Sequence, residues 1–174
     1  PQSGFNEYNA YGYFSDDHGK SWQVSEDVPI ASSNEAIGTV LPNGELILNI
    51  RQQNGIPKRR LIARSNDGGQ SWDSVYFDPK LITPVCQSSL FLFQNAAHTL
   101  LLYSGPNSTE ERIRMTVKAS ENNGLTWPIK KEIYPGISAY SDLTQINESQ
   151  IGLLFEKENK TINFMLFSID WLLN

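Results

Sequence analysis

The chain has 174 residues, a length typical of one domain, and its 14 basic and 19 acidic side chains give a formal net charge of −5. No block of Lys and Arg suits a phosphate backbone, which argues against nucleic acid as a partner, and no apolar run approaches the roughly 18 residues that cross a bilayer. The single cysteine, Cys86, excludes an internal disulfide framework and a thiolate metal cluster.

Short segments rich in β-branched and aromatic residues, bounded by Gly, Pro, Asn or Asp, predict an all-β fold. No segment has the pattern of a helix, and residues 171–173 are expected to end the last strand. In chain order, the expected strands are 45–51, 60–64, 89–93, 99–103, 112–119, 151–156 and 161–169.

One eight-residue motif occurs three times, at Ser15–Trp22, Ser65–Trp72 and Ser120–Trp127. The shared pattern is Ser-x-Asp-x-Gly-x-(Ser/Thr)-Trp, with Asn122 in the acidic position of the third copy. The first serines are 50 and 55 residues apart (65 − 15 and 120 − 65). Self-similarity at an interval of about 50 residues predicts a repeat architecture such as a propeller.

The motif has the composition of a tight turn with an anchor. The Asp or Asn side chain can accept hydrogen bonds from backbone N–H groups two or three residues later, and the Gly supplies a left-handed conformation. The Trp then buries a large ring beside the turn. A calcium loop is the alternative for Asp16 and Asp17, but the regularly spaced acids and terminal Glu of an EF-hand are missing.

About four strands fall within each 50 residues, which is the content of one four-stranded antiparallel blade of a β-propeller. The motif turns are then expected to join the last two strands of each blade. The chain holds about three and a half blades, whereas propellers typically close with four to eight. Either the propeller is small or oligomerises, or residues 1–174 are the C-terminal part of a larger one. A start at Pro1 rather than Met favours the second interpretation.

Four polar positions stand out beside expected strand ends: Glu35, Arg51, Arg112 and Tyr140. Two guanidinium groups beside a Glu–Tyr pair would suit a ligand that carries a carboxylate, because planar guanidinium forks bind carboxylates bidentately. Taken singly, each residue also has a plain interpretation. The arginines could be surface residues, the glutamate a turn residue and the tyrosine part of the packing.

The three motifs and the segments between them resemble the sialidase (neuraminidase) family. The segments are Asn34-Glu35, Leu48 to Arg51, Arg112 and Ala139 to Leu143. Their order and spacing resemble the C-terminal half of the six-bladed sialidase propeller over nearly the whole chain. The resemblance implies an exo-α-sialidase that releases terminal sialic acid from glycoproteins, glycolipids or oligosaccharides with retention of configuration. It implies neither a metal nor a cofactor.

Roles carried over from the family fall on matching residues. Tyr140 resembles the nucleophile, and Glu35 resembles the carboxylate that takes its proton. Arg51 and Arg112 resemble two of the three arginines that bind the substrate carboxylate. Arg112 is preferred to Arg114 because it precedes the motif serine by eight residues (120 − 112).

Two further residues match at the edge of the implied site. Glu156 resembles the acid that orients the remaining arginine, and Gln87 lies in a stretch that helps to line the sugar pocket. A tyrosine nucleophile suits sialic acid, whose anomeric carbon bears a carboxylate. An anionic nucleophile would meet repulsion of about 2 kcal/mol or more near 4 Å. A neutral Tyr whose proton passes to a neighbouring Glu avoids this cost.

Two parts of the family's site have no match. These are the first arginine, in an Arg-Ile-Pro-type motif, and the Asp that acts as general acid and base. Asp16, Asp17 and Asp67 belong to the repeated turns, and Asp142 belongs to the Tyr140 segment. The chain is therefore expected to be inactive alone. Because it holds only about half the blades of such a propeller, it is also expected to expose unpaired strand edges and to associate or aggregate.

Three other functions stay open at this point. A trans-sialidase would use the same residues with a different acceptor. A non-catalytic propeller with the same motifs could bind glycans or proteins. A hydrolase or lyase acting on another acidic sugar would also need the two arginines.

The cellular compartment is also left open. Asn107, Asn147 and Asn159 each begin an Asn-x-Ser/Thr sequence, which accepts a glycan in a eukaryotic secretory pathway. Such short motifs are common by chance, and the first residues do not resemble a signal peptide. Among the alternatives, a secreted, lysosomal or cell-surface location is favoured.

Overall fold

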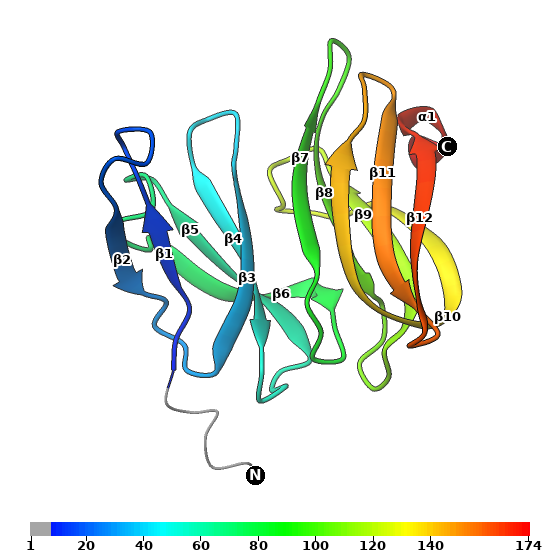
Figure 1. Ribbon diagram of the computed structural model, residues 1–174, viewed down its shortest axis with the longest axis horizontal. Helices are drawn as coiled ribbons and strands as arrows, with labels where there is room; N and C mark the ends of the chain where they lie inside the picture. The colour runs from blue at the N-terminus through cyan, green and yellow to red at the C-terminus, as the bar shows by residue number, and fades with distance from the viewer. Residues whose placement is uncertain (1–7) are drawn as a thin grey trace.

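A computed structural model of the protein describes residues 8–174, which form three antiparallel sheets and one short helix (Figure 1). The expected start of the domain at residue 1 lies outside the described residues. The first sheet pairs β1 (Tyr11–Phe14) with β2 (Gln23–Asp27). The second has four strands in sequence order: β3 (Ser33–Val40), β4 (Leu46–Gln52), β5 (Arg59–Ser65) and β6 (Ser74–Ile82).

The third sheet has six strands, whose spatial order from one edge to the other is β12, β11, β10, β9, β8 and β7. Their bounds are β7 (Ser89–Gln94), β8 (Thr99–Pro106), β9 (Ile113–Ser120), β10 (Ile129–Gln145), β11 (Gln150–Lys157) and β12 (Thr161–Ser168). These curled antiparallel sheets confirm the predicted all-β class. The number of blades in a closed propeller stays a prediction.

Strand β10 changes partners along its 17 residues. Residues 129–137 pair with β9, whereas residues 138–145 pair with β11. Because of this change, the first part of β10 completes the group β7–β9, and its second part is the first strand of the group that continues with β11 and β12. The residues just after the change also lie beside β7, where the Ser89 hydroxyl donates to Asp142 over 2.9 Å.

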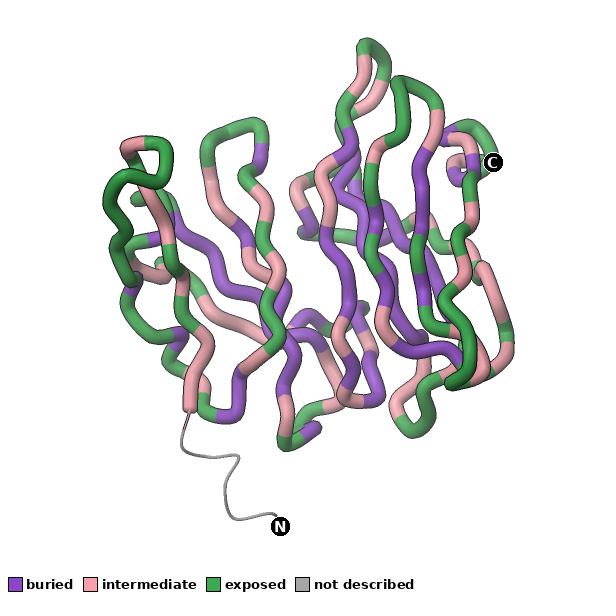
Figure 2. Tube along the Cα trace, in the orientation of Figure 1, coloured by how far each residue is buried: buried purple, intermediate pink, exposed green. Residues whose placement is uncertain are grey.

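The apolar core lies both between neighbouring sheets and within the curled six-stranded sheet, and Figure 2 shows buried segments along the strands. One buried cluster combines residues of the four-stranded and six-stranded sheets, among them Ile47, Ile62, Leu90 and Tyr103. A second lies within the six-stranded sheet and beneath the C-terminal helix. Removal of this apolar surface from water, at about 25 cal/mol per Å², is the main force that holds the sheets together.

The repeated motifs form the turns β1–β2, β5–β6 and β9–β10. In the middle copy, Asp67 Oδ1 accepts the backbone N–H groups of Gln70 and Ser71 over 2.9 and 3.0 Å, and Oδ2 accepts the Ser71 hydroxyl. Ser65 Oγ in turn accepts the N–H of Gly69, whose φ is +92°. Side chains of the motif therefore accept hydrogen bonds from the backbone N–H groups of the same turn. The glycine supplies a left-handed conformation that other residues resist.

Each tryptophan of the motif has its own environment. The indole of Trp72 donates to the Glu26 carbonyl over 2.8 Å, and that of Trp127 donates to Asp78 over 2.9 Å. Trp22 is half exposed instead. The third copy thus has the expected buried tryptophan, whereas the tryptophan of the first copy is exposed.

The C-terminus corrects one expectation. Residues 169–173 form a helix, α1 (Ile169–Leu173), rather than the end of a strand, and β12 stops at Ser168. Ser168 Oγ accepts the N–H of Trp171 over 3.1 Å, and Asp170 lies in the first turn. An N-terminal Ser cap followed by an acid is a helix-start signal, and it outweighs the apolar, strand-like composition of the segment.

Strand β12 forms one edge of the six-stranded sheet. Its alternate residues Ile162, Phe164 and Leu166 are exposed, so this edge strand presents an apolar face to solvent. No helix among residues 8–174 is long and apolar enough to cross a membrane.

Candidate active site

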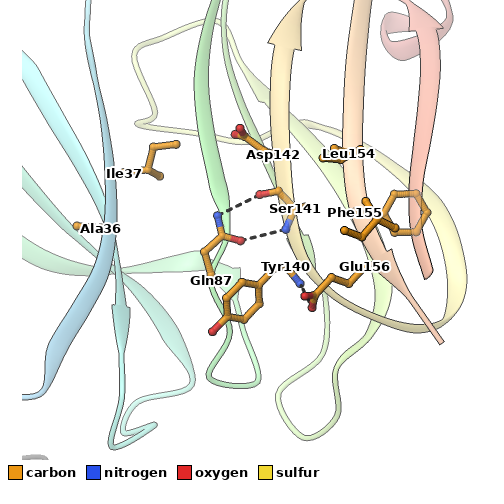
Figure 3. A pocket seen from close by; sticks show the side chains of 10 residues that line it. Ala36, Ile37, Gln87, Tyr140, Ser141, Asp142, Leu154, Phe155 and Glu156 are labelled. Atoms are coloured by element: carbon orange, nitrogen blue, oxygen red, sulfur yellow. Dashed lines mark hydrogen bonds between the residues drawn. The ribbon is translucent and has the colours of Figure 1, made fainter. Parts of the chain in front are cut away.

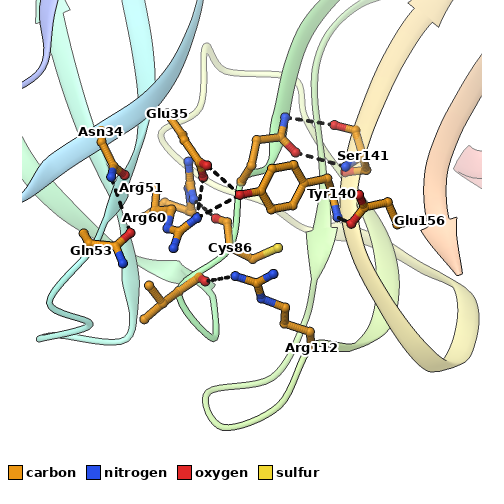
Figure 4. A network of polar contacts seen from close by, with 12 residues as sticks. Asn34, Glu35, Arg51, Gln53, Arg60, Cys86, Arg112, Tyr140, Ser141 and Glu156 are labelled. Atoms are coloured by element: carbon orange, nitrogen blue, oxygen red, sulfur yellow. Dashed lines mark hydrogen bonds and ion pairs between the residues drawn. The ribbon is translucent and has the colours of Figure 1, made fainter. Parts of the chain in front are cut away.

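Glu35 and Tyr140 meet although they lie on different sheets (Figure 4). The Tyr140 hydroxyl donates to Glu35 Oε1 over 2.5 Å. Each residue occurs where the strand pairing is irregular: between Asn34 and Ile37 on β3, and between Ser138 and Ser141 on β10. Such bulges redirect side chains, and Glu35 also has a φ of +41°, which is rare outside glycine. The local backbone therefore directs both side chains toward one point.

Arg51 completes a three-membered cluster with this pair. It lies near the end of β4, and its Nη1 donates to Glu35 Oε2 over 2.6 Å and to the Tyr140 oxygen over 3.0 Å. The arginine side chain is 9% exposed and that of Glu35 is 33% exposed. The ion pair is thus set into the molecular surface with one side open to solvent.

The electrostatics of the cluster keep the acid ionised and the phenol neutral. Burial alone would raise the pKa of Glu35, but hydrogen bonds from Tyr140 and Arg51, together with the charges of Arg51 and Arg112, hold this pKa below its ordinary value. Burial, followed by the hydrogen bond to Glu35 and its charge, raises the pKa of Tyr140. A carboxylate acceptor facing a protonated hydroxyl is the pairing that general-base activation of a nucleophile needs.

Arg112 approaches the tyrosine from another side. Its guanidinium carbon lies 5.6 Å from the centroid of the Tyr140 ring, and its Nη2 donates to the Val85 carbonyl over 3.0 Å. Arg114, by contrast, forms an ion pair with Glu132 at 2.8 Å on an exposed part of β9 and β10. Of the two arginines considered for the site, the structure therefore brings Arg112 to the cluster.

The two remaining expected residues both contact the backbone around Tyr140. Glu156 Oε2 accepts the Tyr140 N–H over 3.2 Å. The side-chain amide of Gln87 donates to the Ser141 carbonyl and accepts the Ser141 N–H, both over 3.0 Å. The five other expected residues thus lie around Tyr140.

A pocket of about 450 Å³ opens beside Tyr140. Gln87 and Glu156 line it together with the tyrosine, and Ile37 and Leu154 give it an apolar wall (Figure 3). No group of three or more His, Cys, Asp or Glu side chains placed to hold a metal occurs within the described range of 8–174. The phenol of Tyr140 and the carboxylate of Glu156 belong to the lining of this pocket, whereas Glu35, Arg51 and Arg112 contact the tyrosine outside that lining.

One buried residue near the site was missed in the sequence. Arg60 is fully buried beside Arg51, and it donates to the Cys86 carbonyl over 2.5 Å (Figure 4). The available signal was the pair of adjacent arginines at the start of the strand sequence Arg-Arg-Leu-Ile-Ala-Arg. Successive strand residues point to opposite faces of a sheet, so the two arginines would not both be expected on the surface.

Comparisons with known proteins identify the family that the chain resembles. The model of the BNR repeat-like domain family matches residues 1–153. A sialidase of Micromonospora viridifaciens is 32% identical over 171 residues, which cover 95% of this chain and 26% of that protein.

Solved structures give the same result. The structure titled Hadza microbial sialidase Hz136 superposes with a TM-score of 0.79 at 31% identity, over 92% of this chain and 32% of that one. An intramolecular trans-sialidase from Ruminococcus gnavus superposes with a TM-score of 0.75 at 24% identity, over 92% of this chain and 38% of that one. The second likeness shows the fold alone. The chain spans about a quarter to two fifths of the length of these three proteins.

Proposed function

Because the chain belongs to the BNR repeat-like domain family of sialidases, we propose that it carries the nucleophile and part of the substrate clamp of an exo-α-sialidase. The observation that carries the proposal is the contact of Tyr140 with Glu35 at 2.5 Å, held by Arg51. The substrates would be sialylated glycoproteins, glycolipids or oligosaccharides.

In the proposed first step, the Tyr140 oxygen attacks the anomeric carbon of the sialoside while its proton passes to Glu35 Oε1. A bond forms between tyrosine oxygen and carbon, and the bond to the aglycone breaks, with its electron pair moving onto the aglycone oxygen. Within residues 8–174, Glu35 is the one carboxylate that hydrogen-bonds the Tyr140 hydroxyl. We assign no residue of this chain as the acid that protonates the leaving group.

In the second step, water attacks the same carbon from the opposite side. The bond to Tyr140 breaks, the phenol oxygen regains its proton from Glu35, and the attacking water releases one proton to solvent as it becomes the anomeric hydroxyl. Two displacements at one centre give overall retention of configuration. A trans-sialidase would differ only in the acceptor that replaces water.

The arginines would bind the carboxylate beside the reacting carbon. Arg51 lies within hydrogen-bond distance of the nucleophile, and the Arg112 guanidinium lies over its ring. Charge-assisted hydrogen bonds from two such groups would hold the substrate carboxylate and offset its charge as the nucleophile approaches. Glu156, with its contact to Tyr140, is proposed to orient a further cation at the pocket, and Gln87 to line the sugar site.

A fluorinated sialosyl fluoride tests this proposal on the chain itself. Fluoride leaves without protonation, so the covalent step can be followed whether or not a leaving-group acid is present. The control is Tyr134, six residues earlier on β10, whose hydroxyl also hydrogen-bonds a glutamate, Glu158. Among residues 8–174, no arginine forms an ion pair with that glutamate. Tyr140→Phe should abolish covalent labelling and Tyr134→Phe should preserve it; labelling that survives in Tyr140→Phe would refute the assignment.

A further inference from the structure

The segment 85–88, between β6 and β7, contacts three parts of the candidate site. Its Val85 carbonyl accepts Arg112, as described above, and its Gln87 side chain binds the backbone of Ser141. Ser141 directly follows the proposed nucleophile. The position of this segment therefore bears on both Arg112 and Tyr140.

The backbone of the segment is in a conformation that it would not adopt by itself. Val85 has a φ of +62°, which is unfavourable for a β-branched residue. Such a conformation persists only where surrounding contacts impose it. Two of those contacts are hydrogen bonds, in which the carbonyl groups of Cys86 and Ser88 accept side-chain donors from the neighbouring four-stranded sheet.

Arg60 supplies the stronger of these donors. Its Nη1 donates to the Cys86 carbonyl over 2.5 Å and its Nε to Asn49 Oδ1 over 2.6 Å, while the Asn49 amide reaches the Ser88 carbonyl over 3.4 Å. Arg60 also lies at a register irregularity between β5 and β6. The bulge and the two bonds direct the guanidinium from the four-stranded sheet toward the segment.

The charge of Arg60 has no local counterpart. The residue is fully buried, it forms no ion pair with any described carboxylate, and its Nη2 has no hydrogen-bond partner. Burial lowers the pKa of Arg60 to about 10, so the group is still charged at neutral pH. Packing alone would be served better by an apolar residue, since a buried unpaired charge is costly.

We propose that Arg60 is a positioning residue of the active site: by holding the segment 85–88, it places Tyr140 and Arg112 for attack on a carboxylate-bearing sugar. The inference rests on the proposed function. Arg60 itself does not touch the pocket. It acts through the Cys86 carbonyl, and through Gln87 and Val85 on either side of it.

Strand β5 provides a matched control. Arg64, four residues after Arg60, is also buried, and it bridges the same two sheets at the opposite end through the Asn123 carbonyl at 2.6 Å. It pairs with Glu45 at 2.8 Å and lies at the motif turn, away from Tyr140. Arg→Lys at each position keeps the charge and removes the planar fork.

The experiment measures covalent labelling by the fluorinated sialosyl fluoride for wild type, Arg60→Lys and Arg64→Lys. The maximal labelling rate and the reagent concentration at half-maximal rate are recorded alongside the melting temperature. Arg60→Lys should lower the maximal rate by about tenfold to a hundredfold, because misplacement by about 1 Å can cost that much. Arg64→Lys should lower the melting temperature and leave the rate unchanged.

Equal rates for wild type and a folded Arg60→Lys would overturn the inference, and so would equal losses in the two lysine variants. Should Arg60→Lys not fold, Gln87→Met tests the next link, because it removes the bridge to Ser141 at similar size; a wild-type maximal rate in that variant would then overturn the inference. Absence of labelling in the wild type would instead count against the proposed function.

Discussion

Tyr140 and Glu35 lie 105 residues apart in the sequence, and the phenol of one donates to the carboxylate of the other over 2.5 Å. The two residues come from β10 of the six-stranded sheet and β3 of the four-stranded sheet. Their contact therefore depends on how the sheets pack as well as on the strands themselves. Arg51 braces the contact by donating to the other carboxylate oxygen of Glu35, Oε2, and to the Tyr140 oxygen.

Glu35→Gln should remove the proton acceptor while keeping the shape of the side chain. We expect the labelling rate to fall by about 10²- to 10⁴-fold, the usual contribution of a general base. Glu45→Gln is the control, since it disrupts a comparable ion pair with Arg64 away from the pocket. A similar loss of labelling rate in both variants would mean that Glu35 has only a structural part.

The same carboxylate should contribute pH-dependent stability. Burial opposes ionisation, but hydrogen bonds from Tyr140 and Arg51 and the neighbouring positive charges keep the pKa of Glu35 below 4.5, its ordinary value. A group whose pKa is lower in the folded state stabilises the fold above its ordinary pKa, and this stabilisation is lost as the pH falls through the folded-state pKa.

Urea unfolding of wild type and Glu35→Gln should therefore show a wild-type advantage at neutral pH that shrinks as the pH falls below 4.5. The labelling rate of the wild type should decline over the same acidic range, because the protonated acid cannot accept the proton of Tyr140. An advantage that increases on acidification would show that the pKa is shifted in the other direction.

Arg112→Ala should weaken binding of free sialic acid by roughly tenfold or more, the size of a lost charged hydrogen bond. Arg114→Ala provides the comparison at a distance of two residues, since Arg114 pairs with Glu132 rather than approaching Tyr140. Titration calorimetry or ligand-observed NMR measures both affinities. If Arg114→Ala weakened binding and Arg112→Ala did not, the assignment of the two arginines would be reversed.

Asp67 should matter for stability and not for labelling. It accepts hydrogen bonds from Ser71 and Gln70, and those from the hydroxyl and the N–H of Ser71 contribute most to holding its pKa well below the ordinary range. Asp67→Ala should lower the melting temperature measured by circular dichroism. Asp67→Asn should lower it less, because Asn122 already accepts the corresponding N–H of Thr126 in the third motif. A lower labelling rate in folded Asp67→Asn would contradict a purely structural turn.

The turns could be predicted from the sequence because their bonds join residues within one eight-residue motif. The all-β class could be predicted for a similar reason, since short alternating segments and turn residues are local features. The helix at Ile169–Leu173 was missed because five mostly apolar residues at the end of a strand have no clear period. Its signals were the Ser168 cap and the acidic Asp170 in the first turn.

Polar residues beside expected strand ends marked Glu35, Arg51, Arg112 and Tyr140 as candidates, but only the resemblance to a family gave them roles. Nothing local to Glu35 or Tyr140 indicates that the two side chains meet, since that depends on bulges in two strands and on the packing of two sheets. Arg60 escaped prediction because its partner, the Cys86 carbonyl, is 26 residues away and belongs to a connecting segment. Every residue has a main-chain carbonyl, so the sequence does not show which one will accept a side-chain donor.

The most direct test of the account is to locate the covalent adduct formed with the fluorinated sialosyl fluoride. Fragmentation mass spectrometry of the labelled protein should place a single sialosyl group on Tyr140, with none on Tyr134 and none anywhere in Tyr140→Phe. An adduct on Glu35 or on another residue, or labelling that persists without the Tyr140 hydroxyl, would contradict the claim that this phenol is the nucleophile.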